Sequence, residues 1–277
     1  MTMPHDHCGA GPAIVFLHGF PFSRLMWREQ IEFLNGHGYR VIAPDLRGLG
    51  ENVAQTSVCD SSSSSDHRLE SVPLATMETM ARDVAALMDE LKIDSAVICG
   101  LSMGCYVAFE LIHNFPSRVN ALILCGPRAQ GSDEAEKASR EAQAQRVLHE
   151  GMGFAVESIS KNLLAAATVR DKPDVGARVT EMVLQTDPVG AAAAQRGMAA
   201  RRDYSNDLPN IKVPTLIVAG GEDGVRTPAD AEFIERRIKG SQLLVIDDAG
   251  HLMNMEQVEV FNETLLTFLK SVSEARP

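Results

Sequence analysis

Hydrophobic residues fall into short continuous runs near the beginning and the end of the chain, and longer stretches with apolar residues at every third or fourth position separate these runs. Continuous apolar runs of strand length predict strands buried on both faces, and their alternation with helices predicts a mostly parallel sheet. The expected strands are 13–18, 39–44, 95–100, 120–125, 215–220 and 243–247. The expected helices are 24–36, 76–91, 103–114, 228–239 and 256–271. This pattern predicts an α/β fold with helices covering both faces of the sheet.

The middle of the chain differs from both ends in composition and in its hydrophobic pattern. Residues 127–209 are rich in Ala, Glu and Arg, show helical periodicity, and are interrupted at Gly151, Pro173 and Pro188. We interpret this segment as an inserted all-helical cap. The predicted domains are therefore an α/β core made of 1–126 and 210–277, and a helical cap of 127–209.

One polar stretch, 51–73, contains five consecutive serines. Such a composition buries too little apolar surface to offset the entropy lost on ordering, so we expect a mobile surface loop. The alternative is a lid over the functional site, because the loop follows the carboxyl end of a predicted strand.

Composition excludes several classes of protein. The hydrophobic fraction of 45% is ordinary, no apolar run is long enough for a membrane span, and the N-terminus lacks a secretory pattern, so we expect a cytoplasmic protein. A net charge of −11 without a basic stripe disfavours nucleic acid and anionic membranes as partners. The five cysteines are odd in number, and Cys99, Cys105 and Cys125 lie in apolar runs, which favours buried thiols. No paired-cysteine motif suggests a metal, and no cofactor is expected.

The segment "CGLSMGCY" places Ser102 between Gly100 and Gly104, after an apolar run and before a helical one. On a tight turn from strand to helix, the serine hydroxyl would project from the edge of the sheet, and the glycines would avoid collisions with neighbouring elements. The backbone N–H of Met103 would lie at a helix N-terminus, where unpaired donors face an incoming anion. The pattern therefore suggests a nucleophile beside half of an oxyanion hole.

A serine nucleophile needs a base, and the base needs an orienting carboxylate. His251 follows the predicted strand 243–247, and both Glu222 and Asp223 follow 215–220, so all lie at the edge where Ser102 is expected. For His18, after the first predicted strand, we expect a structural hydrogen-bonding role. His5, His7 and His67 lie in polar segments that we expect to be mobile.

The segments "FLHGFP", "APDLRGLG", "GLSMG", "GGEDGVRTP" and "DAGHLMNME", in this order, resemble the α/β-hydrolase superfamily with a helical cap. The resemblance implies Ser102 as nucleophile, His251 as general base and acid, and Asp223 as the orienting carboxylate. It also implies that the backbone N–H groups of Phe20 and Met103 form the oxyanion hole. Compared with the family pattern, this loop carries one extra residue between Asp223 and Pro228, so Glu222 stays as an alternative acid. We expect structural roles for Asp247 and Asp248.

A serine in this position implies acyl transfer, and "HGFPFSRLMW" and "RRDYSNDLPNIKVPTLIVAGGED" are similar to carboxylesterases and enol-lactonase-like hydrolases. We expect hydrolysis of small, neutral esters through an acyl-serine, with water as co-substrate. Lactonase activity, cofactor-free perhydrolase or haloperoxidase activity, and ligand binding without turnover are the alternatives. Homo-oligomer formation is left open.

Two further expectations concern side chains in and near the cap. We expect surface roles for Arg128, Arg201 and Arg202 rather than pairing with a substrate carboxylate. The apolar residues of the cap could line an acyl pocket, although core positions are more common at helical spacing; they are Phe154, Leu163, Leu164, Met182, Val183, Leu184 and Met198.

The proposed base also predicts a pH dependence. A histidine must be neutral to accept the serine proton, so we expect activity to rise between roughly pH 6 and 8.

Overall fold

The computed structural model describes the backbone of residues 3–53 and 75–274, and their side chains except those of 157–161. Its centre is a seven-stranded sheet in the order β1-β3-β2-β4-β5-β6-β7, in which only β1 is antiparallel to its neighbour. The strands are β1 (His5–Cys8), β2 (Ala13–Leu17), β3 (Arg40–Pro44), β4 (Ala96–Leu101), β5 (Val119–Cys125), β6 (Thr215–Gly220) and β7 (Gln242–Ile246). The six predicted strands are confirmed within two residues at each end.

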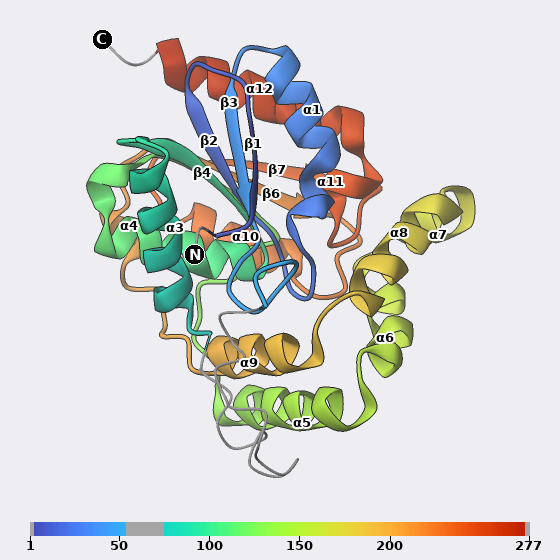
Figure 1. Ribbon diagram of the computed structural model, residues 1–277. Coiled ribbons are helices and arrows are strands. Elements are labelled where there is room, and N and C mark those ends of the chain that lie inside the picture. Colours follow the sequence, from blue (N-terminus) through green and yellow to red (C-terminus); the bar gives the residue numbers. More distant parts are fainter. Residues whose placement is uncertain (1–2, 54–74, 275–277) are drawn as a thin grey trace.

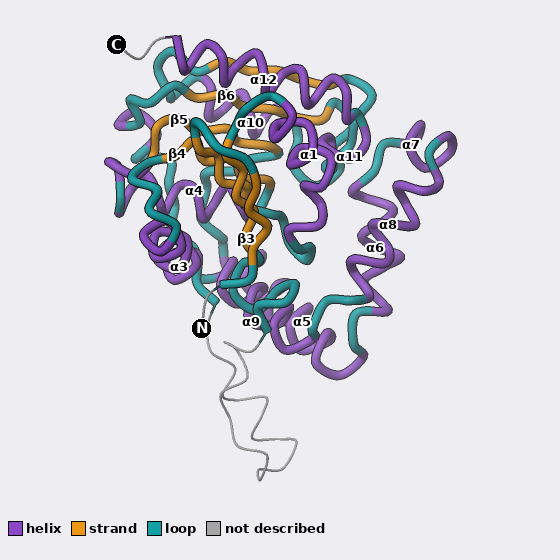
Figure 2. The backbone as a smooth tube through the Cα atoms, turned by 45° about the horizontal axis from the view of Figure 1, so that its top comes forward, coloured by secondary structure: helices purple, strands orange, loops and turns teal. Residues whose placement is uncertain are grey.

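Helices cover both faces of this sheet (Figures 1 and 2). Along β2, Val15 and Leu17 enter one hydrophobic cluster while Ile14 and Phe16 enter the other. This alternation is the period of a strand that is buried on both faces. The first cluster includes α3 (Met77–Glu90), α4 (Met103–Asn114) and α10 (Pro228–Glu235), and the second includes α1 (Arg28–Gly36) and α12 (Val258–Glu274).

The aromatic centre of the second cluster is Trp27, which is fully buried. Its ring lies 4.8 Å from that of Phe16 and 6.2 Å from that of Phe261, measured between centroids. Trp27 ends the short 3₁₀ helix η1 (Arg24–Trp27), which replaces the first turn of the helix predicted over 24–36. The aromatic contacts therefore join β2, η1 and α12.

The strand β1 differs from the sequence-based expectation. His5 and His7 were expected in a mobile polar segment, but they lie in β1, paired with Pro44 and Ile42 of β3. The sequence HDHC carries no apolar alternation, and the pairing of an edge strand depends on backbone hydrogen bonds that any sequence can make. His67 and nearly all of the serine-rich stretch lie outside the described residues.

Two helix ends also differ from the prediction. The helix α10 begins at Pro228 with a capping box between Thr227 and Asp230, but it ends at Glu235 rather than at 239. The helix expected over 256–271 is α12, which begins two residues later at Val258, because Gln257 leaves the helical conformation with φ −124° and ψ 59° and separates it from the short helix α11 (Met253–Glu256). The periodicity of apolar residues, from which these helices were predicted, does not indicate where a helix ends within one or two turns.

Five α-helices and, after them, the short 3₁₀ helix η3 (Leu208–Asn210) separate β5 from β6. The α-helices are α5 (Glu134–Glu150), α6 (Gly153–Leu163), α7 (Ala166–Asp171), α8 (Pro173–Leu184) and α9 (Pro188–Ala199). The predicted interruptions are confirmed, since Gly151 ends α5, Pro173 begins α8 and Pro188 begins α9. In Figure 1, α5 and α9 lie side by side below the sheet, and α6 to α8 extend along one side. We call these five helices the cap, and the rest of the described chain the core.

The cap helix α9 contacts the core through glycine. A Cβ atom on Gly190 would lie 1.6 Å from the carbonyl oxygen of Gly48, and one on Gly197 would lie 2.0 Å from that of Ala75. These glycines are seven residues apart in the sequence and therefore share one face of the helix. Their lack of a side chain allows α9 to lie directly against the core backbone.

A buried ion cluster joins the cap to the segment that returns to β6. Glu136 of α5 lies 3.0 Å from a guanidinium nitrogen of Arg201 and 2.8 Å from one of Arg140, and the ring of Tyr106 lies 4.6 Å below Arg201. Burial alone would raise the pKa of Glu136, but the two guanidinium groups outweigh it and lower the pKa to about 2. The expected surface role of Arg201 is wrong, because its side chain is fully buried. Arg202 is half-buried and pairs with Glu110 and Asp207.

Candidate active site

Ser102 lies on the turn between β4 and α4, with φ 54° and ψ −108°. L residues other than Asn and Asp rarely adopt a positive φ, so the surrounding structure must enforce this conformation. Its backbone N–H donates to the carbonyl oxygen of Cys125 at 2.9 Å. A Cβ on Gly100 would lie 2.5 Å from the carbonyl carbon of Gly104, and one on Gly104 would lie 2.1 Å from the oxygen of Leu17. The two glycines thus leave the space that this turn requires.

His251 lies on the loop after β7 and is buried together with Asp223, which lies after β6. The Nδ1 atom of His251 and Oδ2 of Asp223 are 2.7 Å apart. The second carboxylate oxygen accepts hydrogen bonds from the N–H groups of Val225 and Arg226 at 2.7 and 2.8 Å. A carboxylate only accepts, so Nδ1 carries the proton and Nε2 is left with a lone pair.

The other acidic candidates lie elsewhere. Glu222 is exposed, and its Oε2 accepts from the backbone N–H of Ala166 at 3.0 Å. Asp247 and Asp248 are also exposed, and the carbonyl oxygen of Asp248 accepts from Gln257. Geometry therefore places Asp223, and not its neighbour, against the imidazole.

A glycine at the end of β5 allows the histidine and its carboxylate to approach the turn. Gly126 has φ +54°, and a Cβ on it would lie 2.9 Å from Cε1 of His251 and 3.4 Å from Oδ2 of Asp223. Cys125, the preceding residue, accepts the hydrogen bond from Ser102. Residues 125–126 therefore contact both the serine turn and the histidine pair, a role that the sequence did not suggest.

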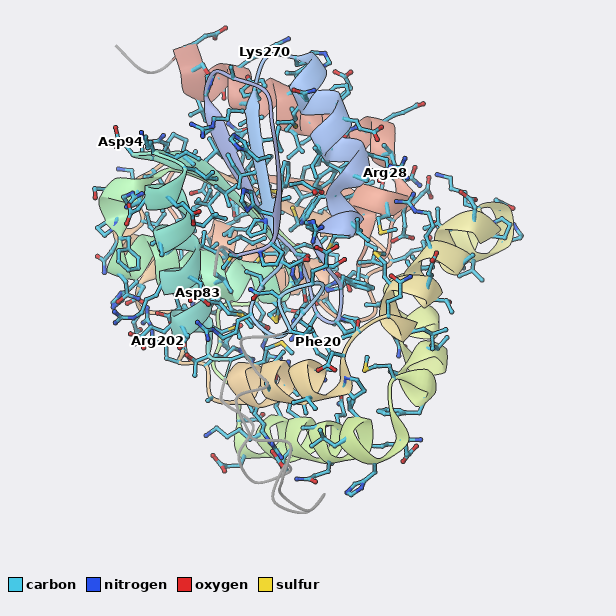
Figure 3. All side chains as sticks on the ribbon, viewed as in Figure 1. Phe20, Arg28, Asp83, Asp94, Arg202 and Lys270 are labelled. Carbon is cyan, nitrogen blue, oxygen red and sulfur yellow. The ribbon has the colours of Figure 1, made fainter. Side chains whose placement is uncertain are left out.

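The loop after β2 lies beside the serine. A Cβ on Gly19 would lie 3.6 Å from Cβ of Ser102, which places the next residue, Phe20, at the same edge of the sheet. In Figure 3, Phe20 lies between the core and α9. Met103 is the first residue of α4, so its N–H has no partner within that helix.

The expected structural role of His18 is confirmed. Its Nδ1 donates to the carbonyl oxygen of Gly19 at 3.0 Å, and its Nε2 accepts from the N–H of Leu46 at 2.9 Å. Complete burial lowers its pKa, although Asp45 opposes this effect. The neutral ring therefore joins the loop after β2 to the loop after β3.

A pocket of about 560 Å³ lies between the core and the cap, and Ser102 and His251 both line it. We call it the interface pocket. The core also contributes Phe20, Pro21, Tyr106, Arg128, Val225 and Arg226, and the cap contributes residues that include Glu136, Ser139, Arg140, Gln143, Arg146, Met152, Phe154, Leu163, Gln195 and Met198. The other apolar cap residues considered from the sequence lie elsewhere: Leu164, Met182 and Val183 are buried in the second cluster, and Leu184 is exposed.

Arginine is abundant in this lining. Arg140 is held by Glu136 and Gln195, and Arg146 by Glu150. Arg128 differs, because it makes no hydrogen bond or ion pair within the described part of the chain and its Nε is buried without an acceptor. Its expected surface role is wrong, since it is half-buried and lines the pocket.

Sequence reasoning also missed Glu256, a fully buried carboxylate behind His251. Its Oε1 accepts from the N–H of Gly250 at 2.9 Å, and its Oε2 accepts from that of Ala165 at 2.7 Å. Burial raises its pKa, while the hydrogen bonds it accepts oppose that effect. The carboxylate joins the histidine loop to the cap, and the only sequence signal was an acidic residue five positions after the histidine in "HLMNME".

Among the side chains that the structure describes, no group of three or more His, Cys, Asp or Glu has an arrangement that could hold a metal ion. The thiols of Cys8, Cys99, Cys105 and Cys125 are free, as expected for the latter three. A search of the described helices found none that is both long and apolar enough to span a bilayer.

Comparison with known proteins agrees with this geometry. Residues 12–258 match the family described as alpha/beta hydrolase fold. A 3-oxoadipate enol-lactonase of Acinetobacter baylyi is 30% identical over 94% of this chain and 90% of that protein. A thermophilic esterase of Thermogutta terrifontis, solved with malate bound, is 38% identical, with a TM-score of 0.88 over 98% of this chain and 93% of that one. Proteins named as non-heme haloperoxidases are also among the relatives.

The chain belongs to the α/β-hydrolase fold family. It is a hydrolase whose relatives include enol-lactonases and esterases, as the sequence motifs implied.

Proposed function

We propose that this protein hydrolyses small carboxylic esters through an acyl-serine intermediate. The observation that carries the proposal is the 2.7 Å contact of Asp223 with His251, which lines the same pocket as Ser102. A histidine whose Nδ1 proton is engaged by a carboxylate presents Nε2 as a base. The identities of relatives named as an enol-lactonase and an esterase, both of which cleave carboxylic esters, support the same class of reaction.

In the acylation step, His251 Nε2 takes the proton of the Ser102 hydroxyl as Oγ bonds to the ester carbonyl carbon. The carbonyl π electrons move onto its oxygen, which then accepts from the backbone N–H groups of Met103 and Phe20. When the tetrahedral intermediate collapses, the bond to the alkoxy oxygen breaks and the imidazolium gives its proton to the departing alcohol.

Deacylation repeats these steps with water. His251 takes a proton from water as the oxygen attacks the acyl carbon, and the second collapse returns the proton to Ser102 and releases the acid. The carboxylate of Asp223 stabilises the imidazolium in both halves of the cycle. The left-handed backbone of Ser102 suits this role because it lifts the side chain out of the sheet edge.

The test is hydrolysis of p-nitrophenyl acetate and butyrate by the wild type and by Ser102→Ala. We expect the variant to lose turnover at least about 10³-fold, because its hydroxyl is the proposed nucleophile. Incubation with a fluorophosphonate probe, followed by mass spectrometry, should label Ser102 in the wild type. Equal turnover by both proteins would reject the serine as nucleophile.

The relatives named as haloperoxidases support a second candidate activity, in which peroxide replaces water as acyl acceptor at the same residues. Acetic acid would acylate Ser102 with loss of water, and hydrogen peroxide would then attack the acyl carbon, releasing peracetic acid and restoring the Ser102 hydroxyl. Peracetic acid oxidises bromide to hypobromous acid, the brominating agent, and is itself reduced to acetic acid. Peroxide-dependent bromination of monochlorodimedone in acetate buffer, absent in Ser102→Ala, tests this activity. A cytoplasmic location and the absence of a cofactor stay predictions, and homo-oligomer formation stays open.

A further inference from the structure

From the interface pocket we infer that the preferred ester carries a carboxylate group, which the guanidinium of Arg128 binds with help from Arg226. This inference rests on the proposed function, since it names the chemical class of the substrate. It also differs from the neutral substrates that the net charge of the chain favours.

Among the described residues of the lining, the two acidic ones are both engaged. Glu136 is held between Arg140 and Arg201. Asp133 is the N-cap of α5 and accepts from the backbone N–H of Glu136 at 2.7 Å. Neither forms an ion pair with Arg128.

The arginines of the lining fall into two groups. Arg140 and Arg146 each have a carboxylate partner on α5. Arg128 has none among the described residues, and Arg226 donates only to the hydroxyl of Tyr106 and the carbonyl of Val225, both at 3.0 Å. The Nε atoms of Arg128 and Arg226 are both buried without an acceptor.

A guanidinium that is half-buried and has no counter-ion is costly, because it loses hydration without gaining a hydrogen bond. A carboxylate is the ligand that matches its planar pair of donors. Arg128 follows β5 and Arg226 follows β6, so both come from the sheet edge that carries Ser102 and His251. A carboxylate of the substrate bound here would hold the ester within the pocket that the serine lines.

The first experiment compares matched esters. For a carboxylate in the acyl half, the pair is p-nitrophenyl hydrogen glutarate and p-nitrophenyl valerate. For a carboxylate in the alcohol half, the pair is p-acetoxybenzoate and p-tolyl acetate. We expect the wild type to favour the charged member of at least one pair in kcat/KM, and Arg128→Gln to lower that preference about 10- to 100-fold, mainly through KM. The pair that responds identifies which half of the ester carries the charge.

The matched control is Arg236→Gln, which removes an arginine that is exposed and paired with Glu232 on α10. This variant should keep the wild-type preference. Arg128→Lys keeps the positive charge without the planar fork, so we expect it to recover only part of the preference. A preference for the charged ester that is the same in the wild type, Arg128→Gln and Arg236→Gln would overturn the inference.

A binding measurement separates the subsite from the chemistry. Calorimetry with glutarate on Ser102→Ala, and on the same protein with Arg128→Gln added, needs no turnover. We expect the second change to weaken glutarate binding at least tenfold, with valeramide as a neutral comparison that binds both proteins equally. If no ester is hydrolysed but glutarate binds through Arg128, the proposed function fails and the subsite stands. If esters are hydrolysed and glutarate binding ignores Arg128, the inference alone fails.

Discussion

The carboxylate of Asp223 contacts His251 Nδ1 with one oxygen, at 2.7 Å, and accepts two backbone N–H groups with the other. This arrangement fixes both the orientation of the carboxylate and the tautomer of the imidazole. Replacing Asp223 with Asn should place an amide N–H against Nδ1 and move the imidazole proton to Nε2. A base that is already protonated cannot accept the serine proton, so we expect kcat for p-nitrophenyl butyrate to fall by about 10⁴-fold with little change in KM.

The adjacent Glu222→Gln is the matched control, because Glu222 is exposed and accepts the backbone N–H of Ala166, which lies outside the histidine pair. It should keep activity close to that of the wild type. A large loss in Glu222→Gln together with a small loss in Asp223→Asn would reverse the assignment of the two carboxylates.

A second prediction concerns Gly126. An alanine here would strain the left-handed backbone and place its Cβ 2.9 Å from the imidazole. We expect Gly126→Ala to lower kcat at least about tenfold, because a displaced imidazole no longer meets the serine hydroxyl. Gly36→Ala, at the end of α1 with no atom within 4 Å of the added Cβ, should keep full activity and gain up to about 1 kcal/mol of stability. Unchanged kcat in Gly126→Ala would show that the histidine is not constrained from this side.

Hydrophobic periodicity predicted the buried strands and most helices because these elements are defined by local packing demands. The edge strand β1 carried no such signal, since its pairing with β3 uses backbone groups. Ser102 and His251 were identifiable because each lies on a short turn directly after a strand. The choice between Glu222 and Asp223 required either family resemblance or coordinates, because adjacent residues on a turn differ in direction and not in spacing.

The sequence-based predictions were least accurate for the arginines, since the surface roles expected for Arg128 and Arg201 were wrong. Whether a guanidinium is buried depends on a distant counter-charge, and Arg201 meets Glu136 across 65 residues of sequence. The position of Arg128 could not be predicted from the sequence either, because the pocket that it lines forms only when cap and core come together.

A third prediction tests Glu256 as a positioning residue. Glu256→Gln replaces one acceptor with an amide donor facing a backbone N–H, of either Gly250 or Ala165. We expect a loss of about 1–3 kcal/mol in stability, and a fall in kcat that exceeds any change in KM, since the histidine loop shifts. Denaturant unfolding and steady-state kinetics measure the two effects.

The control for Glu256 is Glu263→Gln, on the exposed side of α12, which should change neither quantity. A destabilised Glu256→Gln protein with wild-type kcat would limit the residue to a purely structural role.

The fourth prediction uses the pKa of Glu136, which is lowered from its ordinary value of 4.5 to about 2. A carboxylate with a lowered folded-state pKa contributes stability above the ordinary value, and this contribution is lost as the pH falls through the folded-state value. The melting temperature of Glu136→Gln should therefore lie at least about 3 °C below that of the wild type at pH 7, because the buried Arg201 loses its counter-charge. The difference should shrink between about pH 4.5 and pH 2.

Glu78→Gln provides the comparison, because the pair between Glu78 and Arg82 is exposed on α3 and surface pairs contribute little. Its melting temperature should follow the wild type at both ends of the pH range. A constant difference between Glu136→Gln and the wild type from pH 7 down to pH 2 would contradict a charge-based role for the cluster.

The sole tryptophan of the chain, Trp27, is enclosed by aromatic rings on the far side of β2 and is not part of the interface pocket lining. Its intrinsic fluorescence should be blue-shifted in the native state and should move to longer wavelength only when water reaches the second hydrophobic cluster. Occupancy of the pocket leaves that environment dry. The emission spectrum of Trp27 can therefore show whether each variant is folded, because a ligand bound in the interface pocket does not contact the indole ring.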